Sequence, residues 1–272
     1  MIQLVATLVA GYIAFILFLY FFQRRLIYNP GHEVVSPSNT VTPNMDIVTT
    51  NTVDGVELKS WYQDPKSSGA QTIIYFQGNA GTIADRDEKI KAYLEAGFGG
   101  CLVGYRGFAG NAGNPSEHGL YNDGRSILNF LRERNQKSSN WIFYGESLGT
   151  GVATHLAAEL AELKQPIAAL ILEAPYTSMG DVAAQHYPYI PSRKLVREKF
   201  SSLEKIHKID TPLLVIHGEL DSVIKIDLGK RLFALAKEPK KAFWVPAAHH
   251  NDLYSFGASQ VVLTFLEEHL SV

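Results

Sequence analysis

Cysteine is nearly missing from this sequence of 272 residues, and so is any excess of charge of one sign. Cys101 is the single cysteine, so the chain cannot form an internal disulfide or a cysteine metal cluster. We expect it to be a small apolar residue in a strand. The formal net charge of -2 argues against a general nucleic-acid-binding protein. The length and the 46% hydrophobic content fit one full-sized α/β domain.

Charged residues are also absent from positions 2–22, which consist mostly of Leu, Val, Ile, Phe, Ala and Tyr. A helix of this length spans about 31 Å, enough to cross the core of a bilayer. A secretory signal peptide is the alternative interpretation. It would begin with basic residues and end a shorter apolar core in small residues, whereas this run ends in Phe22-Gln23-Arg24-Arg25. We therefore expect an uncleaved, single-pass anchor over residues 1–25.

The residues that flank the apolar run predict its orientation. Arg24 and Arg25 lie on its C-terminal side, and the positive-inside rule then places the large domain on the cytoplasmic side. Residues 26–44 form a polar, proline-dotted connector. Its composition suits a segment that lifts a domain off the membrane or runs along its edge. Residues 45–272 form the large domain.

Beyond the connector, strand-like runs alternate with helical ones. Runs rich in β-branched and aromatic residues predict strands over 45–51, 56–62, 72–77, 99–105, 141–144, 167–173, 213–217 and 242–245. Helices are expected over 83–96, 119–135, 152–163, 227–237 and 252–269. Asp54-Gly55, between the first two runs, is typical of a β-hairpin. The alternation predicts a mainly parallel eight-stranded sheet flanked by helices, with the hairpin as an antiparallel edge.

Residues 176–211 are the exception to this alternation. They contain Tyr187-Pro188-Tyr189-Ile190-Pro191 and then an amphipathic run over 194–206. We expect a small helical cap over the edge of the sheet. An ordinary long crossover helix is the alternative.

The clearest chemical signal is Gly145-Glu146-Ser147-Leu148-Gly149, which separates a strand from an alanine-rich helix. A chain that passes from strand to helix in so few residues must bend sharply, and the two glycines let the backbone close where a Cβ would clash. Ser147 is then held at the tip in a strained conformation, with its hydroxyl above the sheet edge. The pattern predicts a nucleophilic serine. A glycine-rich structural turn is the alternative, because the motif is short enough to occur by chance.

An acid and a base follow the last two predicted strands. Sites in an open parallel sheet form beyond the carboxyl ends of the strands, and these two strands are followed by Asp221 and by His249-His250. The order Ser147, Asp221, His250 is the one expected for a catalytic triad on such a sheet. The imidazole accepts the proton of the serine hydroxyl, and the carboxylate holds the imidazole in one tautomer.

Other acidic residues compete for the role of the acid. Glu173 also ends a strand and is the main alternative to Asp221. Asp210 and Asp227 lie nearby in the sequence, and Asp221 itself could be a turn residue.

The remaining histidines and a nearby acid have structural interpretations. His249 and His250 are adjacent, so only one can face the serine, and we select His250. His217 is expected to pack or to brace a loop, and Asp252 to begin or cap the last helix. His249, His250 and Asp252 match no metal-binding spacing well, so no metal is predicted.

The reaction also needs backbone N–H donors for the tetrahedral oxyanion. Leu148, the residue after the nucleophile, supplies one. The loop Gly78-Asn79-Ala80-Gly81 follows a predicted strand and is placed to supply the other from Asn79. Its glycines keep the backbone of the loop close to the reacting carbon.

Taken together, these motifs resemble the α/β-hydrolase superfamily. More narrowly, the chain looks like its single-pass, membrane-anchored branch, related to bud-emergence proteins and to α/β-hydrolase-domain proteins of eukaryotes. The resemblance runs nearly end to end and includes Phe22-Gln23-Arg24-Arg25-Leu26-Ile27-Tyr28, Tyr105-Arg106-Gly107, Pro115-Ser116-Glu117-His118-Gly119-Leu120-Tyr121, Glu173-Ala174-Pro175-Tyr176-Thr177-Ser178, His217-Gly218-Glu219-Leu220-Asp221 and His250-Asn251-Asp252. It implies Ser147, Asp221 and His250 as the triad, and its His-Asn-Asp ending favours His250 over His249.

One position departs from the family's pattern. Relatives usually carry His-Gly-Asn-Ala-Gly after the third strand, and Gln77 here replaces the histidine. In the family that histidine braces the oxyanion loop and does not react. Glutamine can also donate and accept hydrogen bonds, so we expect activity to survive.

The sequence therefore predicts an α/β-hydrolase fold with an N-terminal transmembrane helix. The expected function is a membrane-anchored serine hydrolase that cleaves carboxylic esters or thioesters of acyl lipids or acylated proteins through an acyl-enzyme. A serine peptidase of the same fold and a catalytically silent, membrane-tethered scaffold are the alternatives. Dehalogenase and epoxide-hydrolase activities are disfavoured, because relatives with those activities place Asp at the position of Ser147. No cofactor and no nucleic-acid partner are implied, and the oligomeric state stays open.

Overall fold

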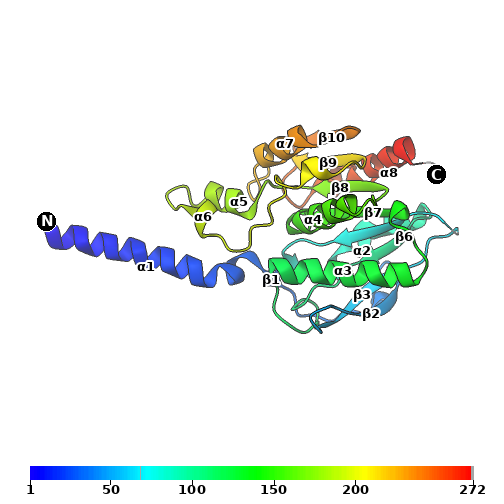
Figure 1. The fold of residues 1–272 in the computed structure, drawn as a ribbon, viewed down its shortest axis with the longest axis horizontal. Helices are drawn as coiled ribbons and strands as arrows, with labels where there is room; N and C mark the ends of the chain where they lie inside the picture. Colours follow the sequence, from blue (N-terminus) through cyan, green and yellow to red (C-terminus); the bar gives the residue numbers. More distant parts are fainter. Residues whose placement is uncertain (68, 271–272) are drawn as a thin grey trace.

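A twisted eight-stranded sheet forms the centre of the protein. The computed structural model describes residues 1–67 and 69–270 (Figure 1). The strands of the sheet are β2 (Asp46–Asn51), β3 (Glu57–Gln63), β4 (Thr72–Phe76), β6 (Gly99–Leu102), β7 (Trp141–Glu146), β8 (Ala169–Glu173), β9 (Leu213–Gly218) and β10 (Lys240–Val245). Their order is β10-β9-β8-β7-β4-β6-β3-β2, and only the β2–β3 and β3–β6 pairs are antiparallel among these described strands. The predicted parallel sheet with an antiparallel hairpin edge is confirmed.

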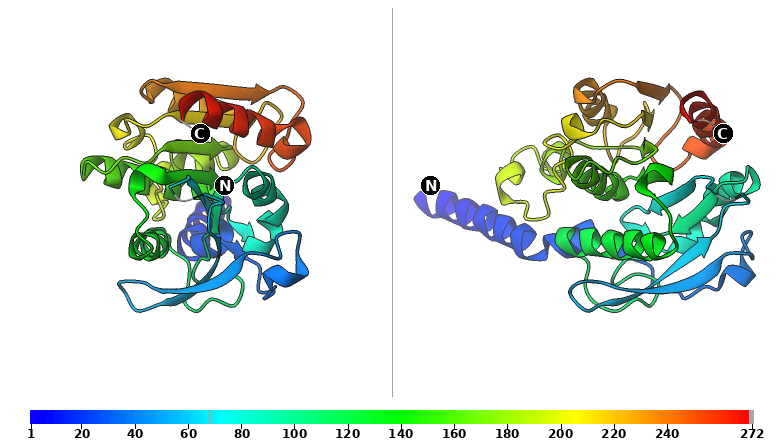
Figure 2. Two further views of the ribbon diagram at one scale, coloured as in Figure 1. Left: turned by 90° about the vertical axis from the view of Figure 1, so that its right-hand side faces the viewer. Right: turned by 45° about the vertical axis from the view of Figure 1, so that its right-hand side comes forward.

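Helices cover both faces of the sheet. One face packs against α3 (Glu117–Glu133), α4 (Leu148–Glu162) and α7 (Ile226–Leu235), and the other against α2 (Asp87–Glu95) and α8 (Ala258–His269) (Figure 2). Strands β4, β7 and β8 are buried along their whole length, as expected for continuous apolar strands covered on both sides. This leaves the carboxyl edge of the sheet as the place where functional loops can gather.

The last predicted helix is divided into two parts. A 3-10 turn at Leu253–Phe256 precedes α8, and Gly257 between them has a φ of +80°. A residue in that left-handed conformation ends one helical segment before the next begins. The division turns α8 back onto the sheet after the segment that carries His250.

The longest helix, α1 (Ile2–Ile27), projects from the body of the protein (Figure 1). Its most apolar 18-residue window has a mean hydropathy of 2.4, and none of that window is buried in the protein. Among the described residues it is the one helix whose length and composition suit a membrane span. The helix continues two residues beyond position 25, and Arg24 and Arg25 lie in its last turn.

The connector after α1 is attached to the hydrolase fold. Within it, β1 (Asn29–Pro30) pairs in parallel with β5 (Ala80–Gly81), in the loop that follows β4. The Gly31 N–H donates to the Gly81 carbonyl at 2.9 Å, and a Cβ on residue 31 would lie 2.9 Å from the carbonyl carbon of Gly81. Composition suggested a spacer, but composition does not say which loop the backbone will pair with.

A cap of two short helices follows β8 and precedes β9 in the chain, and it lies beside α1 (Figure 1). The helices are α5 (Met179–His186) and α6 (Ser192–Leu195). The amphipathic run over 194–206 does not form one continuous helix: α6 ends before Val196, whose backbone is extended. Glu198 and Phe200 are both buried, and Phe200 has a φ of +41°, which no continuing α-helix allows.

Candidate active site

The turn between β7 and α4 places Ser147 at the carboxyl edge of the sheet. Ser147 has φ +50° and ψ −116°, a strained backbone conformation of the kind found at functional sites. A Cβ on Gly149 would lie 2.0 Å from the carbonyl oxygen of Phe76, and a Cβ on Gly145 would lie 2.6 Å from Thr150 Cα. Both positions therefore require glycine, as the strand-to-helix bend predicted.

A histidine and an aspartate lie next to this serine. The Ser147 Oγ is 2.9 Å from Nε2 of His250, and the Nδ1 of His250 is 2.7 Å from Oδ2 of Asp221. The three residues follow β7, β10 and β9, strands that end at the same edge of the sheet. In this arrangement the imidazole can accept the serine proton while the carboxylate fixes its tautomer.

The surroundings of Asp221 keep it ionised. Burial by itself raises its pKa, but hydrogen bonds from His217 and His250, together with the backbone N–H of Ile224, hold the pKa well below its ordinary value. His217 Nε2 lies 3.2 Å from Oδ2 of Asp221 and 2.8 Å from the carbonyl oxygen of Ile224. His217 thus braces the loop that carries the acid.

The two main alternative residues have other partners. The carboxylate of Glu173 accepts hydrogen bonds from Lys89 at 2.8 Å and from the Tyr144 hydroxyl at 2.5 Å. The Nδ1 of His249 lies 3.1 Å from the carbonyl oxygen of Leu220. Neither side chain takes part in the hydrogen-bonded series that begins at the serine.

The other acidic residues near the last strands also have structural roles. Asp210 pairs with Lys237 at 2.6 Å, and Asp227 is exposed in the first turn of α7. Asp252 accepts the backbone N–H of His249 at 2.7 Å, just ahead of the 3-10 turn. Among residues 1–67 and 69–270, no group of three His, Cys, Asp or Glu side chains is placed to hold a metal ion.

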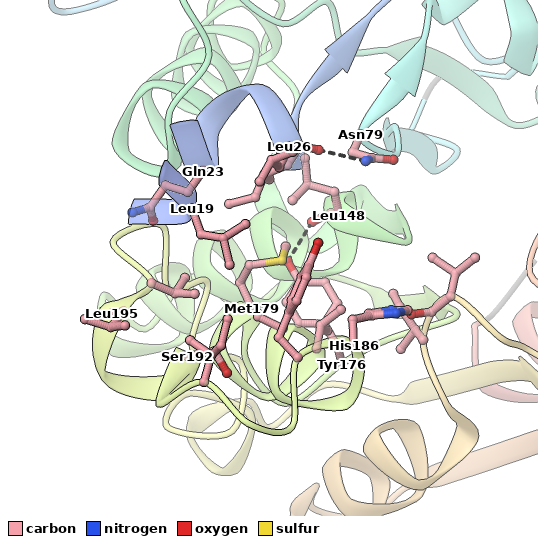
Figure 3. A pocket seen from close by; sticks show the side chains of 18 of the residues that line it. Leu19, Gln23, Leu26, Asn79, Leu148, Tyr176, Met179, His186, Ser192 and Leu195 are labelled. Carbon is pink, nitrogen blue, oxygen red and sulfur yellow. Dashed lines mark hydrogen bonds between the residues drawn. The ribbon is translucent and has the colours of Figure 1, made fainter. Parts of the chain in front are cut away.

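The residues predicted to hold the oxyanion line the same cavity as Ser147. Leu148 is the first residue of α4, so its N–H has no partner one turn earlier in the helix and lies at the positive end of the helix dipole. Asn79 lies in the loop after β4, and its side-chain Nδ2 donates to the Ile27 carbonyl at 2.7 Å (Figure 3). The end of α1 is therefore bonded directly to this loop.

Gln77 does not brace the loop through hydrogen bonds. The side chain is buried, and its Oε1 and Nε2 have no partner among the described residues. The loop is held from other directions: Arg86 donates to the carbonyls of Ala80 at 3.1 Å and Thr82 at 3.2 Å, and β1 pairs with β5. The residue that replaces the family's histidine precedes this loop, but the loop itself is supported by Arg86 and by the connector.

Sequence reasoning missed a buried ion network beneath the two loops. The Glu146 carboxylate accepts from Arg86 at 2.7 Å, from Lys89 at 3.1 Å and from the Tyr75 hydroxyl at 2.5 Å. Burial raises the pKa of Glu146, but the charges of Lys89 and Arg86 outweigh burial and hold that pKa below its ordinary range. The signal for this network in the sequence was Glu146, a charged residue in the otherwise apolar run before Ser147. Through Arg86, Glu146 joins the elbow to the loop after β4.

A cavity of about 520 Å³ opens beside Ser147, between α1 and the cap (Figure 3). Its size is within the range of small-molecule sites, and its walls are mainly apolar. Six of its lining residues belong to α1: Ile16, Leu19, Tyr20, Gln23, Leu26 and Ile27. In Figure 3, Leu19 and Leu26 of α1 lie across the cavity from Met179 of the cap. The sequence predicts α1 as an anchor, and its contribution to this cavity is an addition that the structure provides.

Comparison with known sequences gives relatives over most of the chain. No protein-family profile matches it. An uncharacterised protein of Mycobacterium tuberculosis is 38% identical over 253 residues, which cover 92% of this chain and 87% of that protein. The lysophosphatidylserine lipase ABHD12 of Mus musculus is 34% identical over 198 residues, 67% of this chain. The match spans 49% of the lipase, about half of its length.

Solved structures share the fold. The Pyrococcus furiosus esterase Pf2001 superposes with a TM-score of 0.69 at 21% identity, over 89% of this chain and 99% of the esterase. The esterase RhEst1 from Rhodococcus sp. ECU1013 superposes with a TM-score of 0.65 at 19% identity, over 83% of this chain and 100% of the other. With the sheet order, the elbow and the sequence relatives, these matches confirm the family predicted from the motifs: the chain belongs to the α/β-hydrolase superfamily of enzymes.

Proposed function

We propose that the protein is a membrane-anchored serine hydrolase that cleaves carboxylic esters or thioesters of acyl lipids or acylated proteins. The observation that carries the proposal is the hydrogen-bonded series of Ser147, His250 and Asp221 beside an apolar cavity. In this proposal residues 1–25 anchor the chain, residues 26–44 connect, and residues 45–272 form the hydrolase domain, with its cap near 176–211. Arg24 and Arg25 favour a cytoplasmic location for that domain.

Each member of the series has a defined role in the proposed reaction. His250 accepts the proton of the Ser147 hydroxyl as Oγ attacks the acyl carbonyl carbon. The N–H groups of Leu148 and Asn79 stabilise the oxyanion, and His250 then donates its proton to the leaving alcohol or thiol. Water, activated by the same imidazole, releases the acid from the acyl-enzyme. Asp221 stays ionised throughout and orients His250.

Three observations support an acyl-lipid substrate. The cavity walls are mainly apolar, which suits a hydrocarbon chain. The helix α1, which suits a membrane span, ends at the site. One relative of the chain is a lysophosphatidylserine lipase. A single-chain phospholipid ester is therefore the first substrate to test, with acyl-protein thioesters next.

A peptidase and a silent scaffold are less well supported. A site for a free amino terminus needs a carboxylate, and none of the described residues that line the cavity is acidic. A scaffold has no need for the strained backbone at Ser147, which stable folds retain mainly where function requires it.

The test is covalent labelling of the full chain in detergent with a fluorophosphonate probe. We expect wild type to label and Ser147→Ala to lose labelling and at least about a thousandfold of its esterase activity. Ser139→Ala, at an exposed serine in the turn before β7, at the opposite end of that strand from Ser147, is the matched control and should behave as wild type. Equal labelling of Ser147→Ala and wild type would contradict the assignment.

A panel of substrates tests the reaction class. Acyl esters, acyl thioesters, aminoacyl anilides and lysophospholipids are compared at equal enzyme concentration. We expect turnover of esters and lysophospholipids. A preference for aminoacyl anilides would support the peptidase, and absence of any turnover by wild type would support the scaffold.

A further inference from the structure

The geometry points to a second role for α1, which rests on the proposed function. We propose that α1 is one wall of the acyl-chain site. The acyl chain of a lipid in the adjacent leaflet then reaches Ser147 between α1 and the cap without leaving apolar surroundings. The helix would thus select the substrate as well as anchor the enzyme.

The first support is the position of the cavity along α1. Its lining begins at Ile27, next to Asn79, and continues to Ile16. Ile16 and Ile27 are eleven positions apart along the helix, which corresponds to a rise of about 16 Å. The hydrocarbon core of a bilayer is about 30 Å thick, so the lined stretch matches roughly one leaflet. Arg24 and Arg25, near the catalytic end of this stretch, are suited to the headgroup level, where the ester bond of a lipid lies.

The second support is the opposite wall. The loop between α5 and α6 reaches along α1 until the carbonyl of Tyr189 accepts a hydrogen bond from the Tyr12 hydroxyl at 2.6 Å. Tyr189 is 88% exposed, and its neighbours Tyr187 and Ile190 line the cavity. Tyr12 lies twelve positions before Arg24, a rise of about 18 Å along α1, so this tip lies at the depth of the lipid acyl chains when Arg24 lies at the headgroup level. The cap and α1 then form a channel that opens into lipid.

The third support is the joint that keeps the two walls in register. The buried Glu198 carboxylate accepts from Arg24 Nε at 2.7 Å and from the Tyr28 hydroxyl at 2.9 Å, and it also accepts the backbone N–H of Glu117. The side chain of Gln23 accepts the N–H of Arg197 at 2.7 Å. These bonds tie α1 to the chain after α6 and to α3, so the helix is a fixed wall of the cavity.

The wall is tested with a matched pair of substitutions in the full chain. Leu19→Trp places a larger side chain in the cavity, whereas Leu17→Trp places the same side chain on a face of α1 that is exposed. For Leu19→Trp we expect the ratio of oleoyl-lysophospholipid turnover to p-nitrophenyl butyrate turnover to fall about tenfold. For Leu17→Trp that ratio should stay within about twofold of wild type.

The outcomes separate this inference from the proposed function. If wild type hydrolyses both substrates and the two tryptophan variants give the same ratio, α1 is not a wall of the acyl site and the hydrolase assignment stands. If wild type does not label with fluorophosphonate, the proposed function itself fails. Labelling of Leu19→Trp confirms that the variant is folded around Ser147.

A second measurement tests entry from lipid and does not depend on turnover. Tyr189→Trp in vesicles places an indole at the tip of the cap, and phospholipids brominated on their acyl chains quench only tryptophans that contact lipid. We expect quenching of the added emission beyond that of the native Trp61, Trp141 and Trp244, which lie in the sheet. Absence of additional quenching would contradict entry between the cap and α1.

Discussion

The two loops that meet at Ser147 differ in what holds them. The elbow is held by its own turn and by the neighbouring strand: both the N–H and the hydroxyl of Thr150 donate to the Ser147 carbonyl, at 2.9 and 2.6 Å, and the Ser147 N–H donates to the Glu173 carbonyl at 2.8 Å. The loop after β4 is held from outside, by Ile27 and Asn29 on one side and by Arg86 on the other. The turn itself and the neighbouring strand therefore hold Ser147, whereas Asn79, the second predicted oxyanion donor, depends on a segment that is 52 residues away in the sequence.

The largest expected effect is at the acid that follows β9. Asp221→Asn should lower kcat roughly 10⁴-fold, because the imidazole of His250 loses the carboxylate that fixes its tautomer. Steady-state ester hydrolysis measures the change, and Asp227→Asn, at an exposed aspartate, is the matched control. A nearly unchanged rate in Asp221→Asn would return the role of the acid to Glu173.

Glu146 is the contact that joins the two loops, so its removal should disturb both. Glu146→Gln leaves the buried Arg86 without its main counter-charge and leaves Lys89 paired with Glu173 alone, so we expect a loss of about 3 kcal/mol in the free energy of unfolding at neutral pH. Denaturant unfolding in detergent measures it. Glu57→Gln, at an exposed strand position, should change stability by no more than about 0.5 kcal/mol.

The pH dependence of that loss has a defined sign. The pKa of Glu146 is lower in the folded protein than its ordinary value of about 4.3, so its stabilising contribution is complete above that pH. The contribution disappears as the pH falls through the lower folded-state value. The stability difference between wild type and Glu146→Gln should therefore shrink below about pH 4. A difference that grows on acidification would contradict the ion network.

A smaller effect is expected at the link between the loop and α1. Asn79→Ala removes the 2.7 Å hydrogen bond to the Ile27 carbonyl and keeps the backbone N–H, so kcat should fall about tenfold with KM nearly unchanged. Asn140→Ala removes a comparable bond to the Gly69 carbonyl at 3.1 Å, before the end of β7 opposite to Ser147, and serves as control. Equal kcat in both variants would show that the loop is held without α1.

The smallest effect is expected at Gln77. Because its buried amide has no partner among the described residues, Gln77→Leu should leave the free energy of unfolding unchanged or raise it by about 1 kcal/mol. Thermal unfolding in detergent measures the change. A marked loss of stability would show that the amide of Gln77 is bonded after all.

These differences explain what the sequence could predict. The strands and the elbow were predictable because they depend on local patterns: apolar runs, and glycines that flank Ser147. The meeting of Ser147, Asp221 and His250 was predictable because parallel strands end at one edge, which brings the aspartate and the histidine to the serine from distant positions. Local pattern was sufficient wherever the contact lay within one element or at one edge of the sheet.

The errors share the opposite cause. The amphipathic pattern over 194–206 did not indicate the backbone found there, because Glu198 and Phe200 are buried against other elements, which such a pattern does not reveal. The pairing of Asn29 with the loop after β4 could not be predicted, because a short polar connector carries no register signal. The apolar composition of α1 predicted a membrane span, but composition does not show that one side of the helix lines a cavity.

The buried carboxylate of Glu198 has a consequence for how the enzyme meets its substrate. Because it bonds to α1, to the residue after α1 and to α3, the domain cannot pivot freely on its anchor. For the membrane-anchored hydrolase proposed above, the tilt of the domain against the bilayer is then set by the fold. Substrate encounter becomes lateral diffusion within a single leaflet, so the rate should follow the mole fraction of the lipid there and not its bulk concentration.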